Sequence, residues 1–401
     1  MVVLVTISQG RVMNKKFIEV LPLVLLNFSL SILFTSANAT AQNAQNAKQT
    51  AQQKERQQAE QFAALLSEQT ETSLKYNMVG YLESWGKIGI EEAIAHNYNM
   101  LVIAFGTIDG NQVGMNLNCG PTMPGGCFLP SVQWWPEPPE WIPNFVNSIA
   151  FAHSKGAKVL LSFGGANNTF KPGQTSSSAL AQSIVAYLGK LNLDGIDFDL
   201  EHISTNDFPG SSTERQHYLM DLIKQIKRLD NKLIITSAPQ INPVRSASGA
   251  TIQFVSTGEE TVYNEAISHN LFDYVFAQAY NTPGFTVDNK CVVQWQSAGD
   301  ETYPAFISKI APCLEKLLPK DSKTKIMVGE PANSSDSAGR GALEHGSYSD
   351  MANEYNRIKG LSSFGGAMTW SINEDGKTAD DKGPRAAYSF SSALLPVLSI
   401  D

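Results

Sequence analysis

Short apolar segments that suit β-strands alternate with longer segments of helical period from Tyr76 to the end of the chain. Eight segments have the strand pattern, at 78–81, 101–105, 159–163, 195–201, 233–237, 274–279, 325–328 and 367–370. Repeated alternation of strand and helix predicts an α/β fold of the (β/α)8 TIM-barrel type. The length from Tyr76 to the end fits one such domain.

Two of the segments between these strands have a clear helical period. In 173–192, one helical face carries Leu180, Ile184, Tyr187, Leu188 and Leu191. In 212–229, one face carries Tyr218, Leu219, Leu222, Ile223 and Ile226. Ser211 or Ser212 is the expected N-cap of the second helix, with Glu214 in its first turn.

Acidic and apolar residues alternate along the fourth predicted strand. A strand sends successive side chains to opposite faces, so Asp197, Asp199 and Glu201 share one face. The other face takes Ile196, Phe198 and Leu200. In a barrel, we expect the acidic face to turn toward the axis and the apolar face toward the helices. Glu201 is last in the strand, which predicts a place at the barrel mouth, where active sites of this fold lie.

Three carboxylates on one strand face need a physical reason, because like charges repel and buried ones must be paired, protonated or bound to a cation. Stacked carboxyls push their pKa values apart, so one can stay protonated near neutral pH and act as a general acid. The same spacing suits calcium or magnesium, which prefer oxygen ligands. It also suits an ordinary strand paired with nearby Lys or Arg, so spacing alone leaves three interpretations open.

Composition narrows the class of partner. The chain has 401 residues, of which 42% are hydrophobic and 17% charged, and this is an ordinary globular balance. Its formal net charge is −8, and the sequence has no basic cluster. Nucleic acid is therefore not expected as a partner, whereas neutral ligands are compatible with this charge.

The N-terminus has the features of a secretory signal. Lys15 and Lys16 precede an apolar run at 21–34, and Ala37-Asn38-Ala39 supplies small residues at signal-peptidase spacing. We expect residues 1–39 to be a cleaved signal peptide, with Met13 as an alternative start. The protein is then secreted or periplasmic, without stable membrane insertion; an uncleaved anchor is the alternative.

The Gln- and Ala-rich residues 40–73 are expected to be a polar linker, and residues 74–401 the barrel domain. The four cysteines form an even set, which favours disulfides in an exported chain. Of the three possible pairings, Cys119–Cys127 and Cys291–Cys313 each close a short local loop and are the prediction. Reduced, buried thiols are the alternative. The sequence has no Cys/His cluster typical of zinc sites.

Five ordered motifs lie on the predicted strands. Asp194-Gly195-Ile196-Asp197-Phe198-Asp199-Leu200-Glu201 fits Asp-Gly-x-Asp-x-Asp-x-Glu in every fixed position. The other motifs are Ser162-Phe163-Gly164-Gly165, Ser237-Ala238-Pro239-Gln240, Phe272-Asp273-Tyr274 leading to Gln278-Ala279-Tyr280-Asn281, and Gly365-Gly366-Ala367-Met368-Thr369-Trp370-Ser371. Together they resemble glycoside hydrolase family 18, the chitinases, of the bacterial type.

The resemblance implies a role for each acid. Glu201 is expected to protonate the glycosidic oxygen and later to activate water. The 2-acetamido oxygen of the substrate serves as nucleophile, which is the substrate-assisted exception to the two-carboxylate scheme. Asp199 is expected to orient the acetamido N–H, and Asp197 to share a proton with Asp199. Tyr280 is expected to donate its hydroxyl to the acetamido oxygen, although a buried Tyr with a bonded tip is also a common structural element.

The resemblance also implies a substrate-binding cleft without metal or cofactor. Trp370 is expected under the sugar at the cleavage point, with a core Trp as the alternative. Further expected contributors are Gln278, Gln240, Asn281, Tyr81, Phe105, Gly164, Gly165 and Ser162. Among these, Ser162 is expected to hydrogen-bond Asp197, and the two glycines to allow a close backbone approach.

The implied activity is hydrolysis of β-1,4 linkages between N-acetylglucosamine units of chitin and its oligosaccharides, with retention, by a monomer. Residues 330–364 are too few for the α+β insertion that some family members carry after the seventh strand, so we expect an open cleft and internal cleavage. The alternatives are an endo-β-N-acetylglucosaminidase acting on N-glycans and a chitin-binding lectin that does not cleave. The presence of Glu201 argues against the lectin.

Overall fold

The computed structural model describes residues 73–117, 127–129, 141–246, 249–256, 260–296, 299–335 and 339–400. All of them belong to the unit Gln69–Asp401. The predicted signal peptide and almost all of the predicted linker lie outside these residues, as does Cys119.

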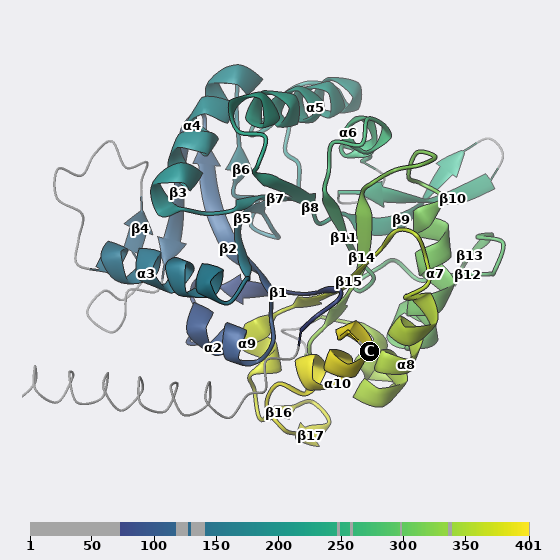
Figure 1. Cartoon of the computed structure of the whole chain (residues 1–401). Helices are drawn as coiled ribbons and strands as arrows, with labels where there is room; N and C mark the ends of the chain where they lie inside the picture. The colour runs from purple at the N-terminus through teal and green to yellow at the C-terminus, as the bar shows by residue number, and fades with distance from the viewer. Residues whose placement is uncertain are drawn as a thin grey trace, which may run out of the picture. The chain divides into compact units, whose positions relative to one another are not determined.

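Eight parallel strands form a closed barrel (Figure 1). In chain order they are β1 (Asn77–Glu83), β2 (Met100–Asp109), β5 (Lys158–Gly164), β7 (Gly195–Asp199), β8 (Ile234–Ser237), β11 (Tyr274–Gln278), β14 (Lys325–Pro331) and β15 (Phe364–Trp370). Strand β1 pairs in parallel with both β2 and β15, and this pairing closes the barrel. Each predicted strand segment overlaps one of these strands, so the predicted (β/α)8 fold is confirmed.

Helices surround the barrel (Figure 1). They are α2 (Ile90–Ala95), α3 (Trp141–Ser154), α4 (Ser177–Leu191), α5 (Ser212–Leu229), α6 (Asn264–Ser268), α7 (Ala305–Glu315), α8 (Tyr348–Ile358), α9 (Ile372–Asp375) and α10 (Ser389–Leu398), with 3-10 turns at η2 (Asp300–Thr302) and η3 (Ala342–Glu344). The two helices read from the periodicity are α4 and α5. Ser211, rather than Ser212, caps α5 in a capping box with Glu214.

Further short strands extend the barrel sheet or form small hairpins, and the sequence analysis did not predict them. They are β3 (Gln112–Leu117), β4 (Cys127–Leu129), β6 (Phe170–Lys171), β9 (Gln240–Ser246), β10 (Gly249–Val255), β12 (Phe285–Val287), β13 (Val293–Trp295), β16 (Ala379–Asp380) and β17 (Gly383–Pro384). Most of them pair antiparallel, whereas β6 pairs in parallel with β2. The β9–β10 hairpin follows β8 directly. Its first residue, Gln240, pairs with Gln278 of β11, so the hairpin starts at the carboxyl end of the barrel.

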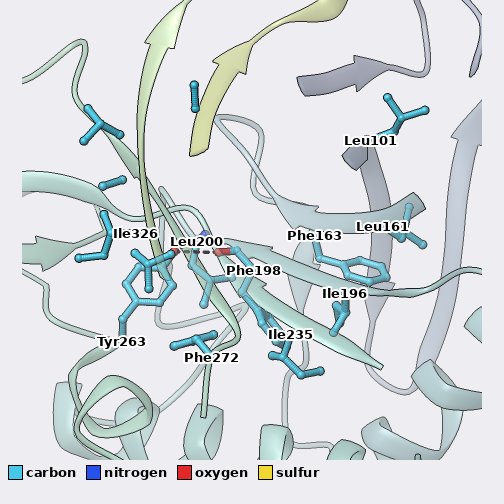
Figure 2. Packing of buried hydrophobic residues seen from close by; sticks show 14 of the residues in the cluster. Leu101, Leu161, Phe163, Ile196, Phe198, Leu200, Ile235, Tyr263, Phe272 and Ile326 are labelled. Carbon is cyan, nitrogen blue, oxygen red and sulfur yellow. Dashed lines mark hydrogen bonds between the residues drawn. The ribbon is translucent and has the colours of Figure 1, made fainter. Parts of the chain in front are cut away.

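Two apolar cores flank the barrel wall. The outer core lies between strands and helices and contains Ile196, Phe198 and Leu200, as the period-two pattern predicted (Figure 2). The inner core fills the barrel and includes Tyr81 and Tyr280. Asp197 and Asp199 alternate with the outer residues along β7, and both are almost completely buried. The strand therefore carries its acids inward, toward the barrel axis.

A disulfide joins Cys291 to Cys313, which confirms that predicted pairing. It connects the turn between β12 and β13 to α7. The predicted Cys119–Cys127 pairing falls outside the residues whose side chains the structure describes. Within the described part of the chain, no helix is both long and apolar enough to cross a membrane.

Candidate active site

The chain turns sharply where β7 ends. The Asp199 carbonyl accepts hydrogen bonds from Gly165 N (2.7 Å) and from Glu201 N (3.1 Å). The second bond bends the backbone, so the strand stops at Asp199 and Glu201 lies beyond it. The prediction that Glu201 is the last residue of the strand is therefore wrong, although the residue does sit at the barrel mouth and lines the cleft described below.

Asp197 is buried in a cage of hydroxyl groups. Its Oδ2 accepts hydrogen bonds from Tyr81 (2.8 Å) and Ser162 (2.6 Å), and its Oδ1 from Thr236 (2.6 Å). The predicted bond from Ser162 is thus confirmed. Burial raises the pKa of Asp197, while the three hydroxyl groups oppose that rise because they stabilise the carboxylate. Both oxygens of this acid therefore have donors, from the adjacent strands β5 and β8 and from β1.

Asp199 and Glu201 form a coupled pair bridged by Gln278. The Gln278 amide nitrogen lies 2.9 Å from Asp199 Oδ1, 3.3 Å from Glu201 Oε1 and 2.9 Å from the Ala238 carbonyl, and donates to them. Burial, followed by the charges of Glu201 and Asp197, raises the pKa of Asp199 well above its ordinary value. Burial also raises the pKa of Glu201, against the Gln278 hydrogen bond.

Both shifts have the same direction, so the pair holds a proton to higher pH than ordinary carboxyl groups do. In this arrangement Asp199 is engaged with Gln278 and Glu201. Proton sharing between Asp199 and Asp197 stays a prediction.

A cleft of about 490 Å³ opens above these acids. Nine of the predicted site residues line it: Tyr81, Phe105, Asp199, Glu201, Gln240, Gln278, Tyr280, Asn281 and Trp370. The structure places the other four, Asp197, Ser162, Gly164 and Gly165, beneath or behind its wall. The cleft also has lining residues that the sequence analysis missed: Ser84, Trp85, Thr107, Ala166, Asn167, Thr169 and Gly339.

An aromatic surface runs from the floor of the cleft to its rim. The Phe105 ring stacks with Trp370 (centroids 5.9 Å apart, planes at 18°) and with Trp85 (6.2 Å, 28°). Tyr81 lies 5.7 Å from Trp370. Trp85 is 55% exposed and is the outermost of the four rings. Its position just after β1, where loops form the active-site face of a barrel, was a signal that could have found it.

Tyr280 and Asn281 follow the end of β11 and lie beside the acids. Burial, together with the charges of Asp199 and Glu201, raises the pKa of Tyr280 well above its ordinary value, so its hydroxyl remains a donor. Asn281 exchanges two hydrogen bonds with the backbone of Arg340, at 2.9 and 2.8 Å. It thereby fixes the segment that carries Gly339 against the cleft.

Two glycines allow the close approach predicted for them. Gly164 has φ 124°, and a Cβ there would lie 1.8 Å from the Asp199 carbonyl oxygen. A Cβ on Gly165 would lie 2.6 Å from the Phe105 ring. A larger residue at Gly164 would therefore push β5 away from the turn that carries Asp199 and Glu201, and one at Gly165 would displace the Phe105 ring.

The family model of the glycosyl hydrolases family 18 matches residues 77–305, more than half of the chain. The chain belongs to this family. The predicted resemblance is thereby confirmed. The described residues of this family 18 hydrolase contain no group of three or more His, Cys, Asp or Glu side chains placed to hold a metal ion.

Several curated relatives resemble this family 18 hydrolase in sequence. An acidic endochitinase of Phaseolus angularis is 27% identical over 322 residues, which cover 73% of this chain and 85% of the relative. An acidic endochitinase of Nicotiana tabacum is 28% identical over 222 residues, covering 50% of this chain and 62% of the relative. A chitinase of Enterococcus faecalis is 25% identical over 244 residues, covering 58% and 64%.

Solved structures share the fold of this family 18 hydrolase. A family GH18 chitinase of Chromobacterium violaceum superposes with TM-score 0.56 and 19% identity, covering 81% of this chain and 85% of its own. A GH18 chitinase of Pseudoalteromonas aurantia gives TM-score 0.54 and 17% identity, covering 80% and 100%. At these identities the likeness concerns the barrel architecture.

Proposed function

We propose that this family 18 hydrolase cleaves β-1,4 linkages between N-acetylglucosamine units in chitin and chitooligosaccharides. The observation that carries the proposal is the coupled Asp199–Glu201 pair at the floor of a cleft with an aromatic surface. Aromatic faces suit the apolar C–H faces of pyranose rings, and a carboxyl with raised pKa suits proton donation to a leaving oxygen. The endochitinase relatives support the same substrate class.

In the first step, protonated Glu201 donates its proton to the glycosidic oxygen while the 2-acetamido oxygen attacks the anomeric carbon. The glycosidic C–O bond breaks, and a cyclic oxazolinium ion forms on the substrate. Asp199 turns from Glu201 to accept a hydrogen bond from the acetamido N–H, and its charge offsets the developing positive charge. Asp197, held in its hydroxyl cage, keeps the proton that the two aspartates share, and this leaves Asp199 charged during the step.

In the second step, Glu201 removes a proton from water, and this water opens the oxazolinium ion at the anomeric carbon. Two inversions at that carbon retain its configuration. The Tyr280 hydroxyl, whose pKa is raised by burial and by the acids beside it, donates to the acetamido oxygen. Trp370 lies beneath the reacting sugar, and Gln278, Gln240 and Asn281 supply polar contacts from the cleft wall.

The segment between β14 and β15 supports internal cleavage of the polymer. Its described residues form η3 and α8 and contain no β-strand of the kind that an α+β insertion would add. The wall on this side therefore stays low, and a long chain can cross the cleft. We also propose that residues 1–39 direct export, that residues 40–73 are a linker, and that residues 74–401 act as a monomeric catalytic domain.

Substitution of the acid tests the reaction. Glu201→Gln is expected to lower turnover of chitohexaose by at least about 100-fold while oligosaccharide binding remains, because an amide cannot donate the proton. Glu265→Gln on α6 is the control and is expected to keep full activity. Product chromatography on chitohexaose and cellohexaose checks both the acid and the need for the acetamido group. Retained activity in Glu201→Gln, or cleavage of cellohexaose, would overturn the assignment. Release of glycans from a high-mannose glycoprotein without cleavage of chitohexaose would instead support an endo-β-N-acetylglucosaminidase.

A further inference from the structure

Tyr263 lies directly behind the turn that carries the acids. It precedes α6 in the connection between β10 and β11, and its side chain is completely buried on the helix-facing side of β7. Its ring packs edge-on against Phe272, with centroids 6.3 Å apart. Figure 2 shows the ring beside Leu200 and Phe198 in the outer core.

The Tyr263 hydroxyl makes two hydrogen bonds to the backbone of this turn. It accepts one from Leu200 N at 2.7 Å and donates one to the Phe198 carbonyl at 3.2 Å (Figure 2). Leu200 N lies between Asp199 and Glu201 along the chain, and the Phe198 carbonyl lies between Asp197 and Asp199. One hydroxyl therefore holds the peptide groups on both sides of Asp199.

The fold leaves a place for this hydroxyl because the sheet ends here. β8 pairs with β7 only as far as Phe198, and β7 itself stops at Asp199. Leu200 is 2% exposed, so its N–H, which lies past the ladder, cannot turn to bulk water. A buried N–H needs a partner, and Tyr263 supplies it. The side chain thus replaces the missing strand neighbour where the chain bends toward Glu201.

We propose that Tyr263 is a positioning residue for this reaction: its hydroxyl fixes the 198–201 backbone and so sets the spacing of Asp199 and Glu201. The inference rests on the proposed function of those acids. Tyr263 itself touches no substrate, because it lies in the outer core while the acids point inward. The titratable groups around the pair are Asp197, Tyr81 and Tyr280 on the inner side and His202 next to Glu201 along the chain, and Gln278 donates to both acids.

Tyr263→Phe tests the hydroxyl and keeps the ring. We expect kcat on chitohexaose to fall at least about tenfold with KM changed less than about twofold, because the acids lose their spacing and the sugar contacts remain. The alkaline limb of the kcat profile is expected to move to lower pH, since weaker coupling lets the pKa of the pair relax toward ordinary values.

Tyr355→Phe on α8 is a matched control. That tyrosine is also completely buried, and its hydroxyl donates at 2.7 Å to the Val328 carbonyl of β14, a strand that carries neither Asp199 nor Glu201. We expect it to lose thermal stability to a similar extent but to keep kcat and the pH profile. Equal effects of the two variants on kcat and pH profile would overturn the inference, as would wild-type behaviour of Tyr263→Phe.

Hydrogen exchange of the wild-type enzyme gives a readout that needs no variant. The Leu200 amide is expected to exchange as slowly as amides within β7, and exchange as fast as an exposed loop overturns the inference even if Tyr263→Phe does not fold. The proposed function has a separate test, because it would be overturned if the Glu201→Gln variant kept its activity. Normal turnover in Tyr263→Phe with inactive Glu201→Gln would leave the function standing and remove only the role of Tyr263.

Discussion

At the residue scale, Gln278 has a larger task than the sugar contact predicted for it. Its amide nitrogen bridges Asp199 and Glu201 and is itself held by the Ala238 carbonyl. By donating to both acids it stabilises their charged forms, and it lowers the pKa of each against the effect of burial. The Gln278 side chain therefore limits how far burial raises the pKa values of Asp199 and Glu201.

Removing this amide is expected to move the pH profile. In Gln278→Met the carboxylates lose a donor, so their pKa values rise further and the alkaline limb of kcat/KM shifts to higher pH by about one unit. Initial rates on chitohexaose between pH 4 and 10 measure the shift. Gln240→Met, in the same cleft wall, is the control and is expected to leave the limb in place. A limb that stays or moves to lower pH would contradict the bridging role.

At the scale of elements, the site depends on how closely β5 approaches β7. Gly164 pairs with Asp199, and the space for a Cβ on Gly164 is occupied by the Asp199 carbonyl. The same carbonyl accepts the hydrogen bond that turns the chain toward Glu201. A side chain at this glycine would therefore act on the acids through the strand.

Gly164→Ala is expected to reduce kcat by at least about tenfold and to destabilise the domain, because β5 and β7 must separate. Gly249→Ala provides a matched control. Gly249 has φ 125°, nearly the φ 124° of Gly164, but a Cβ there meets nothing within 4 Å. The control carries the same backbone strain without the clash. Chitohexaose kinetics and thermal unfolding of both variants separate the two causes, and equal losses would show that strain alone is responsible.

The same elements show what sequence patterns can and cannot predict. Period-two alternation gave the faces of β7, and the 3.6-residue period gave α4 and α5, because both are local properties of the chain. At the end of β7, the local bond from Glu201 N is combined with bonds from Gly165 and Tyr263, which are distant in sequence. The β9–β10 hairpin was missed because Pro243 within β9 argues against a strand, although an edge position tolerates it.

At the scale of the whole molecule, closure of the barrel assembles the cleft. Trp85 follows β1 and Trp370 ends β15, and the pairing of these strands places both beside Phe105. The first and last described segments of the domain meet before the start of β1, where Lys75 N donates to the Leu398 carbonyl. A sequence motif identifies the end of a single strand. The contacts of Trp85 with Phe105 and Trp370 form only when the barrel closes, so no motif predicted Trp85.

The Cys291–Cys313 disulfide acts on the whole molecule through the unfolded chain. It closes a loop with a sequence separation of 22 residues, and restricting such a loop stabilises the folded state by about 3 kcal/mol in the chain-entropy estimate. Cys291→Ser with Cys313→Ala is expected to lower the free energy of unfolding by about that amount, and Ala suits the buried position of Cys313. Neither cysteine lines the cleft, so activity on chitohexaose at 25 °C should remain. Denaturant unfolding measures the loss, and unchanged stability or a large loss of activity would contradict this role.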